Sequence, residues 1–146
     1  MKWIYENNEV DEVPEGFYGF IYLITNKQTG KKYIGRKFFT AAKTRQVNKK
    51  KKKFRVESDW KDYYGSSQEL LDDIELLGKE NFERQIIRLC KTLGETKYWE
   101  VKYQFMYSVL EEKLPNGEWA WYNGNIMMKF HRKNIGSHSL DLITSA

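Results

Sequence analysis

Two tyrosines, Tyr22 and Tyr33, lie in short apolar segments on either side of a turn-forming stretch. The second segment runs into Arg36 and Lys37, which open the most basic part of the chain. A phenol has a pKa of about 10 in water, and a neighbouring cation lowers that pKa by favouring the phenolate. Tyr33 could therefore act as a base, while Tyr22 orients a water molecule or a phosphate. On paired strands, side chains of one face lie about 5 Å apart, so the two rings could flank one phosphate.

The positive charge of the chain is concentrated in one segment. The 146 residues have a formal net charge of +5, and residues 31–55 contain twelve Lys or Arg and no Asp or Glu. Like charges this dense repel one another, so we expect a mobile basic loop over residues 38–58. A solvated loop or a nuclear-type signal is the simpler interpretation. We favour contact with nucleic-acid phosphates, and assign it to Lys37, Lys43, Lys49, Lys50, Lys51, Lys52, Lys53 and Arg55.

The hydrophobic pattern predicts three strands and two helices. Residues 17–25 and 31–35 read as a β-hairpin, and residues 82–90 as a third strand. One helix should begin after Ser66 or Ser67 and end at Gly78, and another should span 95–113. We therefore expect an α+β fold, a small three-stranded antiparallel sheet flanked by helices. Residues 1–16 should form an N-terminal arm and residues 127–146 a basic C-terminal tail.

Several classes of protein do not fit the composition. Cys90 is the only cysteine and lies in an apolar run, so we expect a small core residue and no internal disulfide. No Cys or His cluster has zinc-site spacing. No signal peptide or membrane-length apolar segment is present, which predicts no membrane association and a reducing, cytoplasmic location.

The paired tyrosine segments resemble the motif that defines GIY-YIG nucleases. The second triplet of that motif is intact at residues 33–35, and the first reads Phe-Ile-Tyr at 20–22, with Gly19 one position earlier. The segment "YWEVKYQF" looks like the family's glutamate-bearing helix, and "WYNGNI" looks like its late asparagine segment. The resemblance covers about residues 17–126, which implies a GIY-YIG-like nuclease domain.

The resemblance implies roles for individual residues. Glu100 would be the metal ligand, and Asn123 would contact backbone or phosphate unless it is only a turn residue before Gly124. A single carboxylate is sensible for Mg²⁺ or Mn²⁺, because Mg²⁺ keeps several of its waters. The catalytic arginine is either Arg36 or Arg45, since the usual position of this arginine falls within the basic segment.

A further tyrosine or histidine often precedes the next helix in this family. Tyr63 or Tyr64 could take that place here.

The expected function is a metal-dependent endonuclease that cuts double-stranded DNA. The resemblance is to small phage-encoded homing or exclusion enzymes, which would act in the host cytoplasm and could bind DNA as homodimers. The alternative is a non-catalytic nucleic-acid-binding protein on the same fold. The replacement of the motif glycine by Phe20 is one reason to consider that alternative. An RNA- or ribosome-associated domain would explain the lysines but not the ordered motif.

Overall fold

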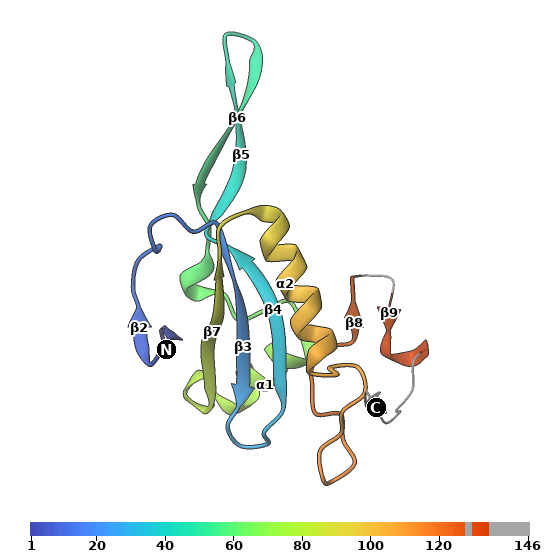
Figure 1. Cartoon of the computed structure of the whole chain (residues 1–146). Coiled ribbons are helices and arrows are strands. Elements are labelled where there is room, and N and C mark those ends of the chain that lie inside the picture. The colour runs from blue at the N-terminus through green and yellow to red at the C-terminus, as the bar shows by residue number, and fades with distance from the viewer. Residues whose placement is uncertain (128–129, 135–146) are drawn as a thin grey trace, which may run out of the picture.

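The computed structural model describes residues 1–127 and 130–134, and shows a central sheet with one α-helix against each face (Figure 1). The strands are β1 (Trp3–Tyr5), β2 (Asn8–Val10), β3 (Gly19–Asn26), β4 (Lys32–Phe38), β5 (Thr40–Val47), β6 (Lys50–Glu57), β7 (Phe82–Cys90), β8 (Asn125–Ile126) and β9 (Phe130–His131). The helices are α1 (Gln68–Leu77) and α2 (Leu93–Met106), and short 3₁₀ turns cover Trp60–Asp62, Lys79–Asn81 and Arg132–Asn134.

The main sheet is larger than the sequence pattern predicts. Its five strands lie in the order β2-β1-β7-β3-β4. The expected antiparallel set of β3, β4 and β7 is present, but β1 adds to β7 in parallel, which makes the sheet mixed. β4 is an edge strand of this sheet, and its outer edge becomes the location of the candidate active site.

The two helices bury different faces of the sheet. Leu70 and Ile74 of α1 pack on one face, whose core includes Tyr22 and Ile86. On the other face α2 packs on the core that includes Ile34, and Cys90 is fully buried there, as expected. α1 begins at the predicted place, because the Ser67 side chain accepts a hydrogen bond from the Leu70 N–H.

The helix α2 is shorter than expected at its C-terminal end. It ends at Met106 rather than near residue 113, and Ser108 soon afterwards adopts a φ of 51°. That positive φ is incompatible with a continuing right-handed helix.

The N-terminal segment 1–16, expected to form an arm, is part of the main sheet. It contributes β1 and β2 to the sheet, and the Trp3 side chain is 1% exposed. The Trp3 indole Nε1 donates to the Trp60 carbonyl at 2.7 Å, and its ring contacts Phe20 with centroids 5.1 Å apart. Trp3 therefore links the N-terminal strands to the core beneath α1.

The segment 38–58 forms regular strands and not the expected loop. Residues 40–57 form the antiparallel hairpin β5–β6, which projects from the end of the main sheet (Figure 1). Sequence reasoning missed it because Lys and Arg occupy both faces of the hairpin, and its few apolar residues, such as Phe54 and Val56, do not give the sustained alternation of a half-buried strand.

Most of the expected C-terminal tail lies outside the described residues. Among the described residues, no helix is long and apolar enough to cross a membrane.

The burial of Trp3 leads to a prediction about the free energy of unfolding. Replacing Trp3 by Ala should lower the free energy of unfolding by about 3–5 kcal/mol, because a large aromatic leaves a cavity in the core. Val13→Ala is the control, since Val13 is exposed and should change stability by less than about 0.5 kcal/mol. Urea denaturation measures both, and a Trp3→Ala cost below about 1 kcal/mol would show that the N-terminal strands are dispensable.

Candidate active site

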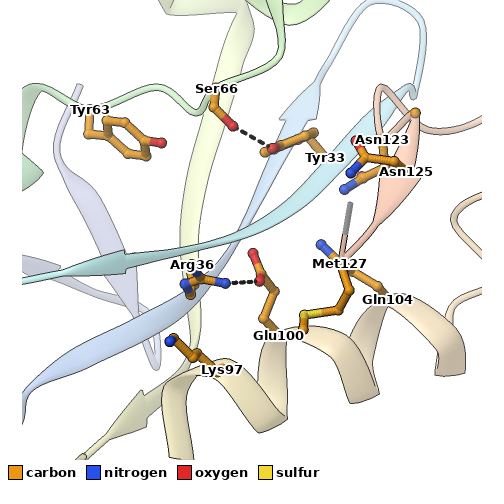
Figure 2. A pocket seen from close by; sticks show the side chains of 11 residues that line it. Tyr33, Arg36, Tyr63, Ser66, Lys97, Glu100, Gln104, Asn123, Asn125 and Met127 are labelled. Carbon is orange, nitrogen blue, oxygen red and sulfur yellow. Dashed lines mark hydrogen bonds and ion pairs between the residues drawn. The ribbon is translucent and has the colours of Figure 1, made fainter. Parts of the chain in front are cut away.

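The candidate site is a pocket of about 490 Å³ that wraps around the outer edge of β4. Residues from both faces of the sheet reach it, because an edge strand has no neighbour to separate the two sides (Figure 2). The lining residues are Tyr33, Arg36, Tyr63, Ser66, Lys97, Glu100, Gln104, Asn123, Gly124, Asn125 and Met127.

The late segment of the chain satisfies the outer backbone groups of β4. Residues 120–122 bind the backbone of Lys32, and Asn123 then binds that of Ile34. The Asn123 side chain accepts from the Ile34 N–H at 3.1 Å and donates to the Ile34 carbonyl at 2.7 Å. The Gln104 amide donates to the same carbonyl at 3.1 Å. Asn123 therefore attaches the late segment to β4. This is the contact with backbone that the resemblance implies for Asn123.

Glu100 and Arg36 meet inside the pocket. A guanidinium nitrogen of Arg36 lies 2.5 Å from a carboxylate oxygen of Glu100 (Figure 2). Burial raises the pKa of Glu100 above its ordinary value, and the charge and hydrogen bonds of Arg36 oppose that rise. The expected metal ligand and one of the two arginine candidates are thus direct partners.

Tyr33 lies in the pocket, while Tyr22 lies behind it. Tyr22 pairs with Gly35 in the β3–β4 register, so Tyr22 and Tyr33 share one face, with ring centroids 6.0 Å apart. The Tyr33 hydroxyl lies 3.0 Å from the Ser66 hydroxyl. Tyr22 is 1% exposed and is not among the lining residues.

The expected lowering of the Tyr33 pKa is wrong for the free protein. Burial raises the pKa of Tyr33, and the hydrogen bond from Ser66 only partly offsets this. Burial raises the pKa of Tyr22 even further. The two neighbouring cations have other partners, since Arg36 pairs with Glu100 and Lys37 pairs with Asp59 at 2.6 Å.

Gly35 is required by the close approach of the Tyr22 ring. A Cβ built at Gly35 would lie 2.4 Å from the Tyr22 hydroxyl oxygen and 3.0 Å from a ring carbon of Tyr33. The last residue of the Tyr-Ile-Gly triplet therefore lets both rings pack on the strand.

Phe20, which replaces the first glycine of the motif, is a core residue. It is fully buried, and the centroid of its ring lies 4.9 Å from the centroid of the Phe39 ring. Gly19 is the position that needs a glycine, because a Cβ there would lie 2.9 Å from the Lys37 carbonyl oxygen. The departure from the motif is thus accommodated by packing outside the pocket.

The remaining candidates divide between the pocket and the hairpin. Arg36 lines the pocket, whereas Arg45 lies in β5 opposite Lys52. Of the two tyrosines before α1, Tyr63 lines the pocket and Tyr64 is buried in the core. The expected nucleic-acid-binding residues between 43 and 55 all lie in the hairpin and none lines this pocket: Lys43, Lys49, Lys50, Lys51, Lys52, Lys53 and Arg55.

Sequence reasoning missed several pocket residues, among them Lys97, Gln104 and Ser66. Lys97 and Gln104 lie three residues before and four residues after Glu100, which places them on the same face of α2. That spacing could have identified both residues. Ser66 precedes the helix cap Ser67, and nothing in the local sequence distinguishes their roles.

Glu100 is the carboxylate that could bind a metal ion in this pocket. The described residues contain no group of three or more His, Cys, Asp or Glu side chains arranged around a common point. A hard cation here would therefore have one carboxylate from the protein, with water and substrate oxygens as its other ligands.

The Arg36–Glu100 ion pair leads to a prediction about the pKa of Glu100. Arg36→Gln should raise the pKa of Glu100 further, because the opposing cation and its hydrogen bond are removed. Lys37→Gln is the control and should leave this pKa unchanged, since Lys37 pairs with Asp59. Carboxyl-carbon NMR titration measures the change, and an unchanged pKa in Arg36→Gln would mean that the pair is not formed in solution.

One of the comparisons with known proteins gives a match. A family model described as "Putative endonuclease segE, GIY-YIG domain" matches residues 3–126, which include the N-terminal strands and every strand and helix around the pocket. The searches of curated proteins and of solved structures gave no match. The match spans most of the 146 residues, and the chain belongs to the segE-type GIY-YIG domain family.

Proposed function

We propose that this protein is a metal-dependent endonuclease that hydrolyses phosphodiester bonds in double-stranded DNA. The main support for the proposal is that Glu100, Arg36 and Tyr33 line one pocket. The chain that contains this pocket belongs to an endonuclease domain family. A carboxylate, a guanidinium and a phenol are the groups that this reaction needs for metal binding, phosphate binding and proton transfer. A homing or phage-exclusion setting is part of the proposal and rests on the resemblance of the sequence.

Glu100 would hold Mg²⁺ or Mn²⁺ in the pocket. When bound, such an ion stabilises negative charge on the phosphoryl oxygens and on the leaving 3′ oxygen. The Glu100 carboxylate is largely buried, with its side chain 15% exposed, and its neighbours in the pocket are mostly uncharged polar groups. A lone carboxylate binds a hard cation weakly, so the substrate phosphate should complete the site.

Arg36 would bind the phosphate and thereby release Glu100. In the free protein the guanidinium is engaged by Glu100 at 2.5 Å, which is the same carboxylate that the cation needs. A phosphate offers two oxygens to the planar guanidinium and competes for it. Binding of DNA should therefore raise the affinity of the pocket for the cation.

Tyr33 would act as the base that takes a proton from the attacking water. Its hydroxyl is held by Ser66 and faces the pocket (Figure 2). Because its pKa is raised, only a small fraction is phenolate at neutral pH, and this fraction grows about tenfold with each pH unit. Tyr22 would support the Tyr33 ring from beneath rather than touch the substrate.

Glu100→Gln tests the metal-binding role. Glutamine keeps the size of the side chain and removes the charge that the cation needs, so cleavage of supercoiled plasmid in Mg²⁺ should fall by about 10³-fold. The neighbouring Glu95→Gln variant is the control, because Glu95 lies in the first turn of α2 outside the pocket lining, and this variant should cleave normally. Normal cleavage by Glu100→Gln would place the metal elsewhere. A wild-type protein that shifts DNA in a gel but never cuts it would instead be a binding protein.

Tyr33→Phe tests the base. The rate should fall by about 10²-fold or more, because general-base catalysis typically contributes at least this much. Tyr22→Phe should lose less activity, since Tyr22 lies outside the pocket lining. Single-turnover rates of the wild type should rise about tenfold per pH unit between about pH 6.5 and 9, and this slope should disappear in Tyr33→Phe. An unchanged pH profile would assign the base to another group.

A further inference from the structure

The β5–β6 hairpin is a regular two-stranded ribbon. Eight residues in each strand pair without interruption from Thr40↔Glu57 to Val47↔Lys50. Asn48 and Lys49 form the connecting turn with φ values of 50° and 61°, which is typical of a type I′ turn. At about 3.4 Å per residue the ribbon is about 27 Å long.

Both faces of the ribbon are positively charged. The pairing places Lys43, Arg45, Lys50 and Lys52 on one face, and Lys51, Lys53 and Arg55 on the other. All seven residues are exposed, so neither face is covered by the described protein. An element that only rests on the surface of a polyanion needs cations on one face. Two cationic faces suit a ribbon that lies between two rows of phosphates.

The charges of the ribbon are not neutralised within the described structure. Arg45 lies directly opposite Lys52, and like charges opposite each other destabilise a hairpin. None of the salt bridges between described residues involves a lysine or arginine of the ribbon. An anionic partner would remove this repulsion, which an ordinary solvent-exposed hairpin would avoid by alternating the signs of its charges.

The base of the ribbon is fixed next to the active site. Thr40 begins β5 four residues after Arg36, and Arg55 donates to the Thr40 hydroxyl at 2.7 Å and to its carbonyl at 2.8 Å. A second cleft of about 470 Å³ lies at this base and includes Arg36, Lys37 and Arg55 in its lining. Arg36 lines both this cleft and the active-site pocket, so the two concave surfaces meet at one side chain.

We propose that the β5–β6 hairpin inserts into the major groove of the DNA duplex that the active site cuts. This inference rests on the proposed function for its DNA substrate. The major groove is about 12 Å wide and admits a two-stranded ribbon, whereas the minor groove is about 6 Å wide and takes such a ribbon only when the DNA is deformed. The cations of the two faces would then meet the phosphates of the two DNA strands, within about one helical turn of the scissile bond.

Matched double variants test the insertion. Arg45→Gln with Lys52→Gln neutralises two cations on one face, and Lys51→Gln with Lys53→Gln neutralises two on the other. Binding to a 30-base-pair fluorescent duplex is measured by anisotropy across salt concentrations, without divalent metal. Each pair should reduce the slope of log K against log salt by about 1.8, since each lost phosphate contact removes about 0.9.

The control is a double variant outside the hairpin. Lys27→Gln with Lys113→Gln replaces two exposed lysines and should leave the slope of log K against log salt unchanged.

If only one of the two double variants changes the salt slope, the insertion is overturned. That result would indicate a ribbon that lies with one face on the DNA backbone. The groove is tested in the same assay by competition. Methyl green occupies the major groove and should displace the protein, while netropsin occupies the minor groove and should not. The reverse result would overturn the assignment of the groove.

These measurements separate the two proposals, because none of them requires cleavage. A protein that binds in this way but never cuts DNA would refute the proposed nuclease activity and support the inserted hairpin. A protein that cuts DNA while both double variants keep the wild-type salt slope would refute the inserted hairpin alone.

Discussion

The outer edge of β4 is the constraint on which the candidate site depends. A strand at the edge of a sheet exposes backbone N–H and C=O groups that must find partners. Here the partners are the late segment at Lys32 and the Asn123 and Gln104 side chains at Ile34. These partners do not form a further strand along β4. Beyond Ile34 the strand meets α2 through the ion pair between the Arg36 and Glu100 side chains. The pocket is thus the place where strand pairing stops.

This arrangement explains how two faces of one sheet supply a single site. Tyr33 belongs to the face covered by α1, while Arg36 points to the face covered by α2. In the middle of a sheet, neighbouring strands would keep such side chains apart. At an edge only one strand separates them, so the phenol and the carboxylate can reach the same phosphate. Gly35 lies between them and allows the tyrosine rings to pack closely against the strand.

Under the proposed function, the ion pair between Arg36 and Glu100 would link this pocket to substrate binding. Each side chain is the other's partner in the free protein, and each would acquire a different partner in the complex. The same arginine also lines the cleft at the base of the β5–β6 hairpin. A duplex held by the hairpin would therefore present its phosphates to Arg36 first. On this account the order of events is DNA binding, release of Glu100 and completion of the metal site.

Parts of this architecture could be predicted from local sequence. The strands β3, β4 and β7 have the expected apolar pattern, and α1 has a serine cap and a terminal glycine. The strand β1 escaped prediction because three residues show no period, and its parallel pairing with β7 joins segments about eighty residues apart. The β5–β6 hairpin escaped prediction because its fold comes from backbone pairing and a type I′ turn, without an apolar face.

The candidate site could be predicted in its residues more readily than in its electrostatics. Spacing and resemblance identified Tyr33, Glu100 and Asn123, and the structure brings all three to one pocket. Which of Arg36 and Arg45 lies in the pocket could not be predicted from local sequence, because the β5–β6 hairpin carries Arg45 away from it. The raised pKa of Tyr33 could not be predicted either, since burial under the segment around Ser66 outweighs cations that are adjacent only in sequence.

The most direct test of the account is to locate the metal ion. Amide NMR spectra of the isotopically labelled protein would be recorded with a duplex bound, before and after addition of substoichiometric Mn²⁺, at a pH low enough to suppress cleavage. The account predicts paramagnetic broadening centred on Ile34, Arg36 and Glu100, and much weaker broadening at the same Mn²⁺ concentration without DNA. Broadening centred elsewhere, or equally strong in the free protein, would contradict a metal site completed by substrate at the edge of β4.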